Sequence, residues 1–489
     1  MNRIKGHRYV TFESKIIHSG FWSLGSSWAL RGLGLVKTVV IARLLTPADF
    51  GLIGLALFSI NAVNVFSDAG FESALIQRRE LDRRTLDTAW TVSFLRGLTL
   101  FLLFMVSAEW VAAYFESPDL APVLRVMAVS LLLSGCNNIG MVFFQRDLEF
   151  KKKAILEMAS EFGGTVVTLA LAVWCRNVWA LAIGSVALAA LKCWGSYRLH
   201  PYRPRICTDW RVAAELMGFG KHIFMISLLA FIITNFDDAL VGKMLGLEML
   251  GFYTMAFNIA SIPVSSLVGV LSQVFFPAYA RLQQEAALVD DAFRRTFEGG
   301  LLILLPLSGL MIALAPGFTI VFLGEKWAPM IPALQALCFF GLFRGLSSFF
   351  YPLHLGVNRP DIQVKIKAVD LVSFLVLVYP FTLAWGILGT SWAMAAVYLV
   401  NLALNIVFTR RILSLPLRRL AGAALFPAFV ALLVYAVAVL LQSLDIPGGE
   451  LIRTLLIASA GSAIVMGLFA VCRKQLLSDV ITAVKASTH

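Results

Sequence analysis

Two basic side chains lie inside an apolar stretch of this 489-residue sequence, where charge is costly. Arg31 and Lys37 fall within WALRGLGLVKTVVIARLLTPADFG, residues 28–51, which predicts one long apolar helix. An arginine or lysine at the centre of a membrane helix costs about 2.5 to 3.5 kcal/mol, so it normally faces a protein interior or a wet cavity. Six helical residues separate the two side chains by about 9 Å along the axis and roughly 120° around it. We therefore expect both to border one wide cavity, with Gly32 and Gly34 leaving the backbone between them uncovered.

The chemistry of a cavity lined by cations is anion binding. Guanidinium and ammonium groups in a narrow setting attract phosphate or pyrophosphate, so the expected substrate is anionic at one end. Three further arginines inside apolar segments are candidates for the same site: Arg96, Arg125 and Arg344. Arg96 and Arg125 could instead pair with Glu161 or with other neighbours. Arg344 and Asp370 lie at comparable depth on consecutive segments, where an ion pair fits the sequence as well as a ligand site does.

Acidic residues inside apolar segments are candidates for ion coupling. Three of them are the candidates for this role: Asp237, Asp238 and Asp370. Intramembrane carboxylates act as proton relays in pumps and transporters. The sequence does not itself indicate which ion would be coupled.

Other kinds of chemistry lack the residues that they need. The six cysteines show neither a CxxC motif nor paired Cys/His spacing, so we predict no metal site, no cofactor and no disulfide framework. No GxxxxGK(S/T) motif for ATP hydrolysis occurs. The carboxylates expected on the outer face are scattered over separate loops, which disfavours an enzyme and leaves no catalytic residue to name. They are Asp49, Glu116, Asp119, Glu325, Asp445 and Glu450.

Composition identifies the elements that must position these residues. Hydrophobic residues make up 59% of the chain and charged residues only 14%, against about 25% charged residues in soluble domains. One crossing of a bilayer takes roughly 20 apolar residues. We therefore predict an all-α polytopic membrane protein with about 14 transmembrane helices. Their expected spans are residues 18–44, 50–72, 87–109, 120–144, 154–175, 178–199, 217–243, 249–279, 294–318, 328–356, 362–384, 387–409, 420–441 and 451–472.

Lysine and arginine cluster in alternate loops, which predicts the orientation. The basic loops include QRRELDRR, QRDLEFKKK, YRLHPYRPRICTDWR and RRILSLPLRR, and the loops between them carry few cations. Under the positive-inside rule the basic loops and both termini face the cytoplasm. The net charge of +12 then follows from membrane topology and predicts no nucleic-acid partner. The polar start of the chain, followed by a long apolar run, predicts no cleaved signal peptide.

An internal repeat indicates two related lobes. The segment VIARLLTPADFGLIGLA, residues 40–56, matches LVGKMLGLEMLGFYTMA, residues 240–256, at an offset of 200. Gly51 corresponds to Gly251, and Arg43 corresponds to Lys243. Two blocks of six helices enter a membrane in the same direction, as parallel repeats do in some transporters. We predict an N-terminal lobe at residues 1–200, a C-terminal lobe at 201–412, and two extra helices with a cytoplasmic tail at 413–489.

The segment ARLLTPADFGLIGLALFSINAVNVFSDAGFESALIQRRE, residues 42–80, resembles the signature of a transporter family. This family is the polysaccharide transporter branch of the MOP flippase superfamily, the Wzx-type lipid-linked oligosaccharide flippases. The resemblance is densest over residues 20–160 and implies a MOP/MATE-like fold. The first helix is also similar to that of lipid II flippases, which implies that Arg31 and Lys37 hold a pyrophosphate. Thr38 departs from those relatives, which carry an acid there.

The resemblance also implies a function, a location and partners. The implied function is the non-enzymatic transfer of a polyprenyl-pyrophosphate-linked sugar repeat unit to the outer leaflet, by alternating access, for exopolysaccharide or lipopolysaccharide biosynthesis. The implied location is the bacterial inner membrane. The implied partners are the lipid-linked sugar, the bilayer, and a polysaccharide polymerase with its export machinery.

Two other functions use parts of the same pattern. A membrane-embedded polysaccharide polymerase or ligase would need acid, base or metal groups on the outer face, where the loops are short. A cation-coupled drug exporter of the related branch would need an acidic cavity, whereas the first lobe carries cations. The flippase interpretation needs no covalent chemistry and uses the basic lining directly.

Overall fold

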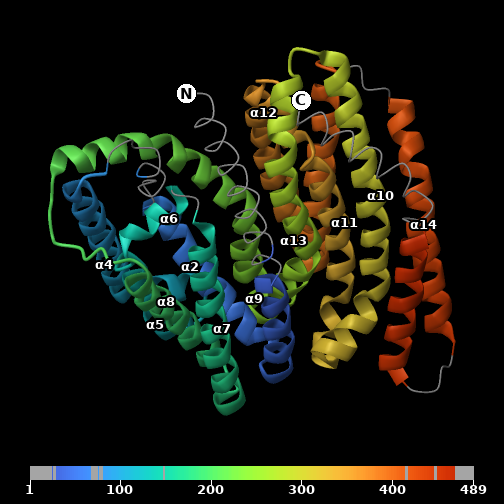
Figure 1. The fold of residues 1–489 in the computed structure, drawn as a ribbon. Helices are drawn as coiled ribbons and strands as arrows, with labels where there is room; N and C mark the ends of the chain where they lie inside the picture. Colours follow the sequence, from blue (N-terminus) through green and yellow to red (C-terminus); the bar gives the residue numbers. More distant parts are fainter. Residues whose placement is uncertain are drawn as a thin grey trace. The chain divides into compact units, whose positions relative to one another are not determined.

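The computed structural model describes residues 29–67, 81–146, 149–413, 417–444 and 449–467, together with the single residues 25 and 75. Every element within these ranges is a helix (Figure 1). Ten helices of the described part are long and apolar enough to cross a membrane. The predicted all-α membrane fold is thereby confirmed. The number of crossings stays a prediction, because some of the long helices contain two of the expected spans.

The chain forms two compact units, residues 1–251 and residues 252–489. The first unit contains a helix over residues 29–44, α2 (Pro47–Ser67), α4 (Arg83–Tyr114), α5 (Leu120–Gly135), α6 (Val142–Arg146), α7 (Phe150–Cys175), α8 (Trp179–Leu199) and the first part of α9 (Trp210–Leu282). Gly97 of α4 and Gly135 of α5 oppose each other, and a Cβ on either would lie 2.7 Å from a carbonyl oxygen of the other helix. Small residues permit this close approach of membrane helices. The lobes predicted from the repeat, 1–200 and 201–412, remain a prediction.

The segment expected as one span at residues 120–144 is interrupted. α5 ends at Gly135, and the 3-10 helix η1 (Ile139–Met141) and α6 follow. The side-chain oxygen of Asn138 accepts a hydrogen bond from Gly140 N–H at the start of η1. Its amide nitrogen donates to the backbone oxygens of His200 at 3.2 Å and Tyr202 at 2.9 Å. The expected span was too long, because an asparagine that bonds to nearby backbone favours a turn over a continued helix.

The two copies of the repeat contact each other within the first unit. A Cβ on Gly51 would lie 1.8 Å from the carbonyl oxygen of Leu247, and a Cβ on Gly251 would lie 1.8 Å from that of Pro47. At the offset of 200, Pro47 corresponds to Leu247, so the two contacts are equivalent. The start of α2 and the adjoining turn of α9 therefore cross where only glycine fits. Gly246, with φ 85° and ψ 178°, interrupts α9 between the spans expected at 217–243 and 249–279.

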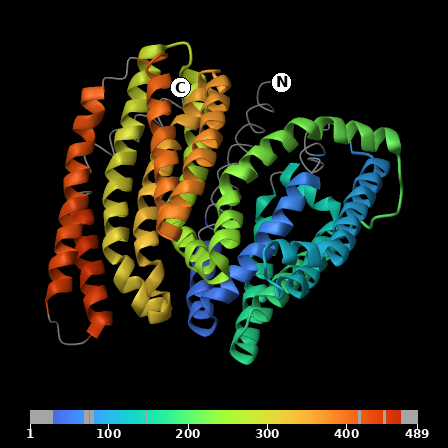
Figure 2. The ribbon, with the colours of Figure 1, turned by 180° about the vertical axis from the view of Figure 1, so that it is seen from behind.

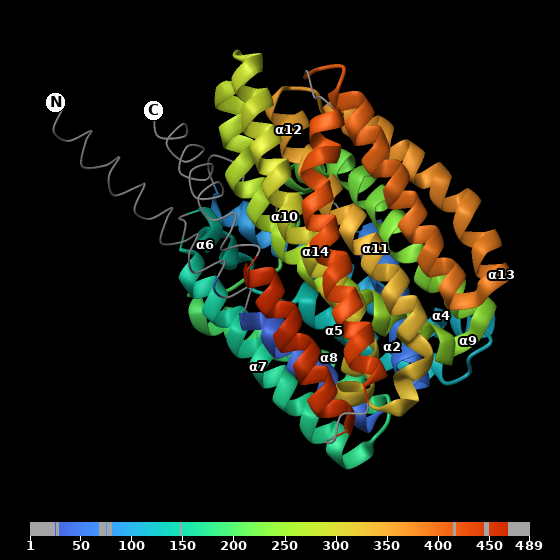
Figure 3. The ribbon, with the colours of Figure 1, turned by 90° about the vertical axis from the view of Figure 1, so that its right-hand side faces the viewer.

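The second unit is a bundle of long helices (Figures 1 and 2). It contains the second part of α9, α10 (Ala286–Phe318), the π-helix η2 (Thr319–Leu323), the 3-10 helix η3 (Glu325–Met330), α11 (Ile331–Ser347), α12 (Phe350–Gly356), α13 (Pro360–Thr409), α14 (Leu417–Ser443) and a last helix, Gly449–Gly467. Gly309 of α10 packs directly on Ala431 of α14. Figure 3 shows these two helices side by side. The extra helices expected at 420–441 and 451–472 are thus part of the second unit.

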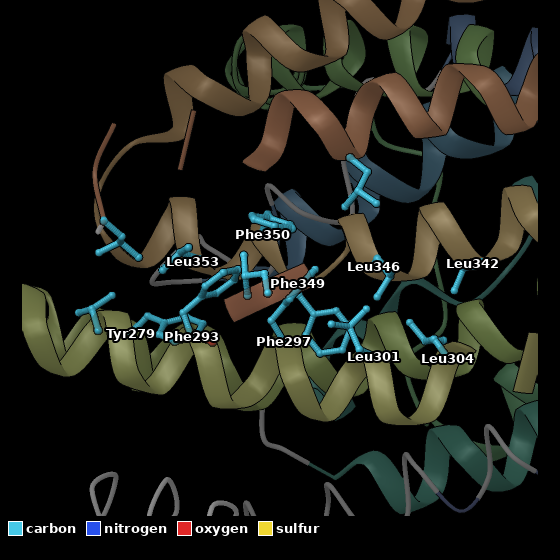
Figure 4. Close-up of a cluster of buried hydrophobic side chains, with 14 residues drawn as sticks. Tyr279, Phe293, Phe297, Leu301, Leu304, Leu342, Leu346, Phe349, Phe350 and Leu353 are labelled. Atoms are coloured by element: carbon cyan, nitrogen blue, oxygen red, sulfur yellow. The ribbon is translucent and has the colours of Figure 1, made fainter. Parts of the chain in front are cut away.

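An aromatic core joins α10 to α11 and α12. Phe293 and Phe297 of α10 point toward Phe349 and Phe350, and the ring centroids of Phe293 and Phe350 are 5.0 Å apart (Figure 4). Each of these four side chains is at most 5% exposed. Dense packing of large rings stabilises helix contacts through dispersion, which operates in lipid as it does in water.

α13 consists of two helical arms that fold back on each other. Trp385 and Gly386 leave the helical conformation, and Gly386 has a φ of 58°. The hydroxyl oxygens of Thr382 and Thr390, on either side of this break, are 2.8 Å apart. The arms occupy the spans expected at 362–384 and 387–409. This hairpin positions the buried polar residues of the second unit.

Candidate functional site

The first described helix, residues 29–44, carries the predicted anion-binding pair. Arg31 and Lys37 are both half-buried. Among the residues that the structure describes, no atom of another segment lies within 4 Å of a Cβ built on Gly32 or Gly34. Lys37 makes no hydrogen bond or ion pair with the residues that the structure describes. The two cations therefore flank open helix surface, which is the arrangement that a cavity wall needs.

Arg96 and Arg125, the other predicted cations of the first unit, have partners there. Arg96 on α4 is half-buried and donates to Asn64 Oδ1 on α2 at 3.3 Å. Arg125 on α5 pairs with Glu109 on α4, with 2.8 Å between nitrogen and oxygen. Both side chains of this pair are substantially exposed, at 39% and 64%. The carboxylate beside Arg125 is thus Glu109 and not Glu161, and it competes with any phosphate for that guanidinium.

Arg344, the last predicted cation, lies near the end of α11 and is half-buried. Its guanidinium carbon is 5.7 Å from the centre of the Phe340 ring, one turn earlier. This distance is within the range of a cation–π contact. The ion pair between Arg344 and Asp370, which the sequence left open, does not form. Lys367 takes that role, with its Nζ 2.9 Å from Asp370 Oδ2.

Asp370 lies in a buried polar network between the two arms of α13. Its side chain is 1% exposed. Asn401 Nδ2 donates to both carboxylate oxygens, at 2.9 Å to Oδ1 and 2.7 Å to Oδ2, in addition to the bond from Lys367. A buried carboxylate is tolerated when its oxygens accept several hydrogen bonds. Asp370 therefore ties one arm of the hairpin to the other.

The network continues from Asn401 to the end of α12. Asn405 Nδ2 donates to Asn401 Oδ1 at 2.9 Å, and Gln363 Nε2 donates to Asn405 Oδ1 at 3.2 Å. The same Gln363 nitrogen lies 2.7 Å from His354 Nδ1, and His354 Nε2 lies 2.8 Å from Thr409 Oγ1. His354 and Thr409 are fully buried. Because a bilayer offers no water to such groups, pairing within the protein is what allows them inside a membrane helix bundle.

Only Asp370 of this network was identified from the sequence. The residues that were missed follow helical spacing. Gln363, Lys367 and Asp370 lie three or four residues apart on the first arm, and Asn401 and Asn405 lie four apart on the second. Residues with this spacing share one face of a helix. Polar faces on two consecutive apolar spans were therefore the signal that could have predicted the network.

Asp237 and Asp238 lie on α9 in the first unit, ahead of the break at Gly246. Asp237 is 1% exposed, and Asp238 is half-buried. Consecutive helical residues point about 100° apart, so the two side chains leave the helix in different directions. Asp370 belongs to the second unit. The three residues predicted for ion coupling are therefore not gathered within one unit.

Comparison with known proteins decides the family. A family described as polysaccharide biosynthesis protein matches residues 40–332, more than half of the chain. The chain belongs to this family. It is 26% identical over 403 residues to the lipopolysaccharide biosynthesis protein WzxC of Escherichia coli (strain K12), and the match covers 81% of each chain. It is also 26% identical over 341 residues to the succinoglycan biosynthesis transport protein ExoT of Rhizobium meliloti (strain 1021), covering 69% of this chain and 68% of that one.

Solved structures place this polysaccharide biosynthesis family member in the MOP fold. It superposes on the lipid II flippase MurJ, inward closed conformation, with a TM-score of 0.77 at 15% identity, over 94% of this chain and 99% of MurJ. An inward-facing multidrug resistance MATE family transporter of the MOP superfamily matches with a TM-score of 0.62 at 14% identity, over 78% of this chain and 93% of that one. At such identities the likeness establishes the fold alone, and it confirms the MOP/MATE-like fold predicted from the sequence.

The predicted charges of this family member thus have different surroundings. Arg125 and Asp370 are neutralised by Glu109 and Lys367 within their own units. Lys37, by contrast, flanks the uncovered glycines of the first helix. A large anionic ligand needs both positive charge and space, and the first helix offers both.

Proposed function

We propose that this protein is a flippase for a polyprenyl-pyrophosphate-linked oligosaccharide repeat unit, which it moves from the cytoplasmic to the outer leaflet. One observation carries the proposal. Arg31 and Lys37 are half-buried in an apolar helix of a MOP-type fold, and Gly32 and Gly34 leave room beside them. Guanidinium and ammonium groups supply several donors to phosphate oxygens, so a pyrophosphate suits this surface. The names of the relatives, which refer to polysaccharide biosynthesis and transport, support the choice of substrate class.

The proposed mechanism contains no covalent step. The pyrophosphate docks on the cations of the first helix. The sugar hydroxyls would lose their hydrogen bonds in lipid, so they pass through a hydrated interior while the prenyl tail stays in the bilayer. A switch between inward-open and outward-open states then exposes the sugar on the other side. Such a switch needs only a difference in substrate affinity between the two states.

For ion coupling we favour Asp237 and Asp238 over Asp370. The Asp370 carboxylate already accepts three hydrogen bonds within the second unit. Releasing it would break the contact between the arms of α13. Asp237 and Asp238 lie on the helix that leads to Gly246, where a conformational change would alter their surroundings.

Mass spectrometry of lipids that copurify with the protein tests the flippase function. The wild-type protein is expected to retain a polyprenyl-linked sugar. Arg31→Ala should retain about tenfold less, because a hydrogen bond to a charged group contributes about 1.5 to 3 kcal/mol. In cells, the same variant should lose surface polysaccharide while its protein level holds.

Arg410→Ala is the matched control, since it removes one exposed arginine at the end of α13. It should leave both the bound lipid and the polysaccharide unchanged. The absence of polyprenyl-linked sugar from wild type and variant alike would reject the proposed substrate. Undiminished polysaccharide with Arg31→Ala would reject the phosphate-binding role of that residue.

A further inference from the structure

The segment between α8 and α9 is held against the start of α4 by buried side chains. Arg205 N–H donates to Asp87 Oδ1 at 3.1 Å, and Cys207 N–H donates to Thr91 Oγ1 at 3.0 Å. Tyr202 adds its hydroxyl, which donates to Asp87 Oδ1 at 2.5 Å. Burial, together with this bond, raises the pKa of Tyr202 above its ordinary value, so the hydroxyl remains a donor. Residues 200–209 therefore have a fixed path along α4, with alternate backbone N–H groups bound to it.

This fixed path forms a pocket of about 390 Å³ where the segment joins α9. Its lining residues are Arg84, Cys207, Thr208, Asp209, Trp210 and Arg211. Two guanidinium groups thus accompany a single carboxylate. Asp209 Oδ1 accepts a hydrogen bond from Arg211 N–H at 3.0 Å, which fixes the first turn of α9. The pocket is shallow and wide open to its surroundings, as a site for the headgroup of a membrane lipid must be.

The surroundings of the pocket are typical of a membrane–water boundary. The pocket lies where α8 has ended and α4 begins, and Figures 1 and 2 show the start of α9 beside this end of α4. Trp210 is 77% exposed and Ile206 is 81% exposed, next to the exposed Arg205. Tryptophan is enriched at the level of lipid headgroups, where an apolar ring and a polar edge are both satisfied. Exposed apolar side chains beside arginines are costly in water and favourable at a lipid surface.

We infer that this pocket binds the headgroup of an acidic phospholipid. The planar guanidinium groups of Arg84 and Arg211 donate to the phosphate oxygens, while Trp210 and Ile206 contact the lipid beside them. A free phosphate would use only the arginines, so the two exposed apolar side chains favour the lipid. The hydrogen bonds from α4 keep the pocket formed before the lipid arrives, which lowers the entropy that binding costs. None of the residues that line this pocket is used in the proposed flippase mechanism, so binding there can be tested without flipping.

Native mass spectrometry of the purified full-length protein tests this site, with phosphatidylglycerol and phosphatidylcholine as probes. The wild-type protein should bind phosphatidylglycerol more tightly than phosphatidylcholine. Arg84→Ala/Arg211→Ala should weaken phosphatidylglycerol binding by roughly tenfold, because both charge-assisted contacts are lost. Asp209→Asn should strengthen it, because asparagine can still cap α9 while the repelling charge is removed. Equal binding of the two lipids by the wild type, or unchanged phosphatidylglycerol binding by the double variant, overturns the inference.

Two controls distinguish lipid binding from a general effect of surface charge and from binding of a soluble anion. Arg410→Ala/Arg411→Ala removes two exposed arginines at the end of α13 and should leave phosphatidylglycerol binding unchanged. Glycerophosphoglycerol supplies the same phosphodiester without acyl chains, and it should compete only at much higher concentration. Competition at equal concentration would identify a soluble anion site and overturn the lipid inference. Circular dichroism of each variant checks that the helices are intact.

Discussion

At the scale of single residues, Arg125 and Asp370 each lie in an apolar helix and are each paired with an opposite charge of their own unit. Arg125 and Asp370 were identified because charge inside an apolar span is costly wherever it points. Their partners depend on how each helix is rotated about its axis, which a residue count cannot fix. The partner of Arg125 is Glu109 on the adjacent helix, with 2.8 Å between nitrogen and oxygen, and sequence spacing alone does not identify it. Lys367 and Asp370 are three residues apart, so they share one helix face, and this pair was predictable from the sequence as a local contact.

The Asp370 network makes a prediction about stability. Asp370→Asn would place an amide nitrogen near the donors of Lys367 and Asn401, so a buried donor is left unsatisfied. Such a loss costs about 1 to 3 kcal/mol. We expect a lower melting temperature for the detergent-solubilised variant, measured by the intrinsic fluorescence of its tryptophans.

Asp361→Asn is the matched control, because Asp361 lies on the same helix arm and its ion pairs with Arg359 and Lys365 are exposed. Its melting temperature should stay close to that of the wild type. If Asp370→Asn melts at the same temperature as the control, the network does not hold the arms together.

Asp237 makes a prediction about ion coupling. In a transport assay, Asp237→Asn should change the pH dependence of flipping. A pH profile like that of the wild type would count against coupling through Asp237.

At the scale of elements, helix breaks were predictable where turn residues separate two apolar spans. The gaps expected after residues 243 and 384 coincide with the non-helical Gly246 and the Trp385–Gly386 pair. The break after Gly135 falls inside the span expected at residues 120–144, where Asn137 and Asn138 are flanked by apolar residues on both sides. Hydropathy averages over many residues, whereas a turn depends on one or two side chains that bond to the backbone.

The reciprocal contact between the repeats makes a further prediction about stability. Gly51→Ala and Gly251→Ala should each destabilise the protein, because the added Cβ would lie 1.8 Å from a backbone carbonyl oxygen. Backbone cannot move aside as a flexible side chain can, and overpacking costs about 1 to 3 kcal/mol or more. Because the two sites are equivalent under the offset of 200, we expect similar losses of melting temperature for both variants.

Gly422→Ala on α14 is the control, since no atom of the described part of the chain lies within 4 Å of a Cβ at this position. It should be neutral or stabilising, because alanine is favoured over glycine inside a helix by about 1 kcal/mol. If Gly51→Ala lowers the melting temperature no more than Gly422→Ala does, α2 and α9 can move apart at this contact without loss of stability. If Gly51→Ala lowers the melting temperature and Gly251→Ala does not, the two contacts are not equivalent.

At the scale of the whole molecule, composition and charge pattern predicted the class of protein. A chain with 59% hydrophobic residues can place many apolar helices in lipid, where each helix satisfies its own backbone hydrogen bonds. The MOP fold of its structural relatives agrees with that prediction. The division into residues 1–251 and 252–489 was not predicted. A repeat identifies segments of common origin, whereas compact units depend on which helices pack together. Here Gly251 contacts Pro47, so part of α9 packs with the first unit.

The orientation of the molecule remains a prediction that two cysteine positions can test. The positive-inside rule places the turn after α7 outside and residues 200–209 inside. Cys175 is exposed at the end of α7, and Arg205 is exposed between α8 and α9. In otherwise cysteine-free protein, a membrane-impermeant maleimide should label Cys175 in intact spheroplasts. It should label an Arg205→Cys variant only after the membrane is opened, which also controls for a thiol that does not react. Labelling of position 205 in intact spheroplasts would mean that the true orientation is the reverse of the predicted one. The direction in which the proposed substrate enters would then be reversed as well.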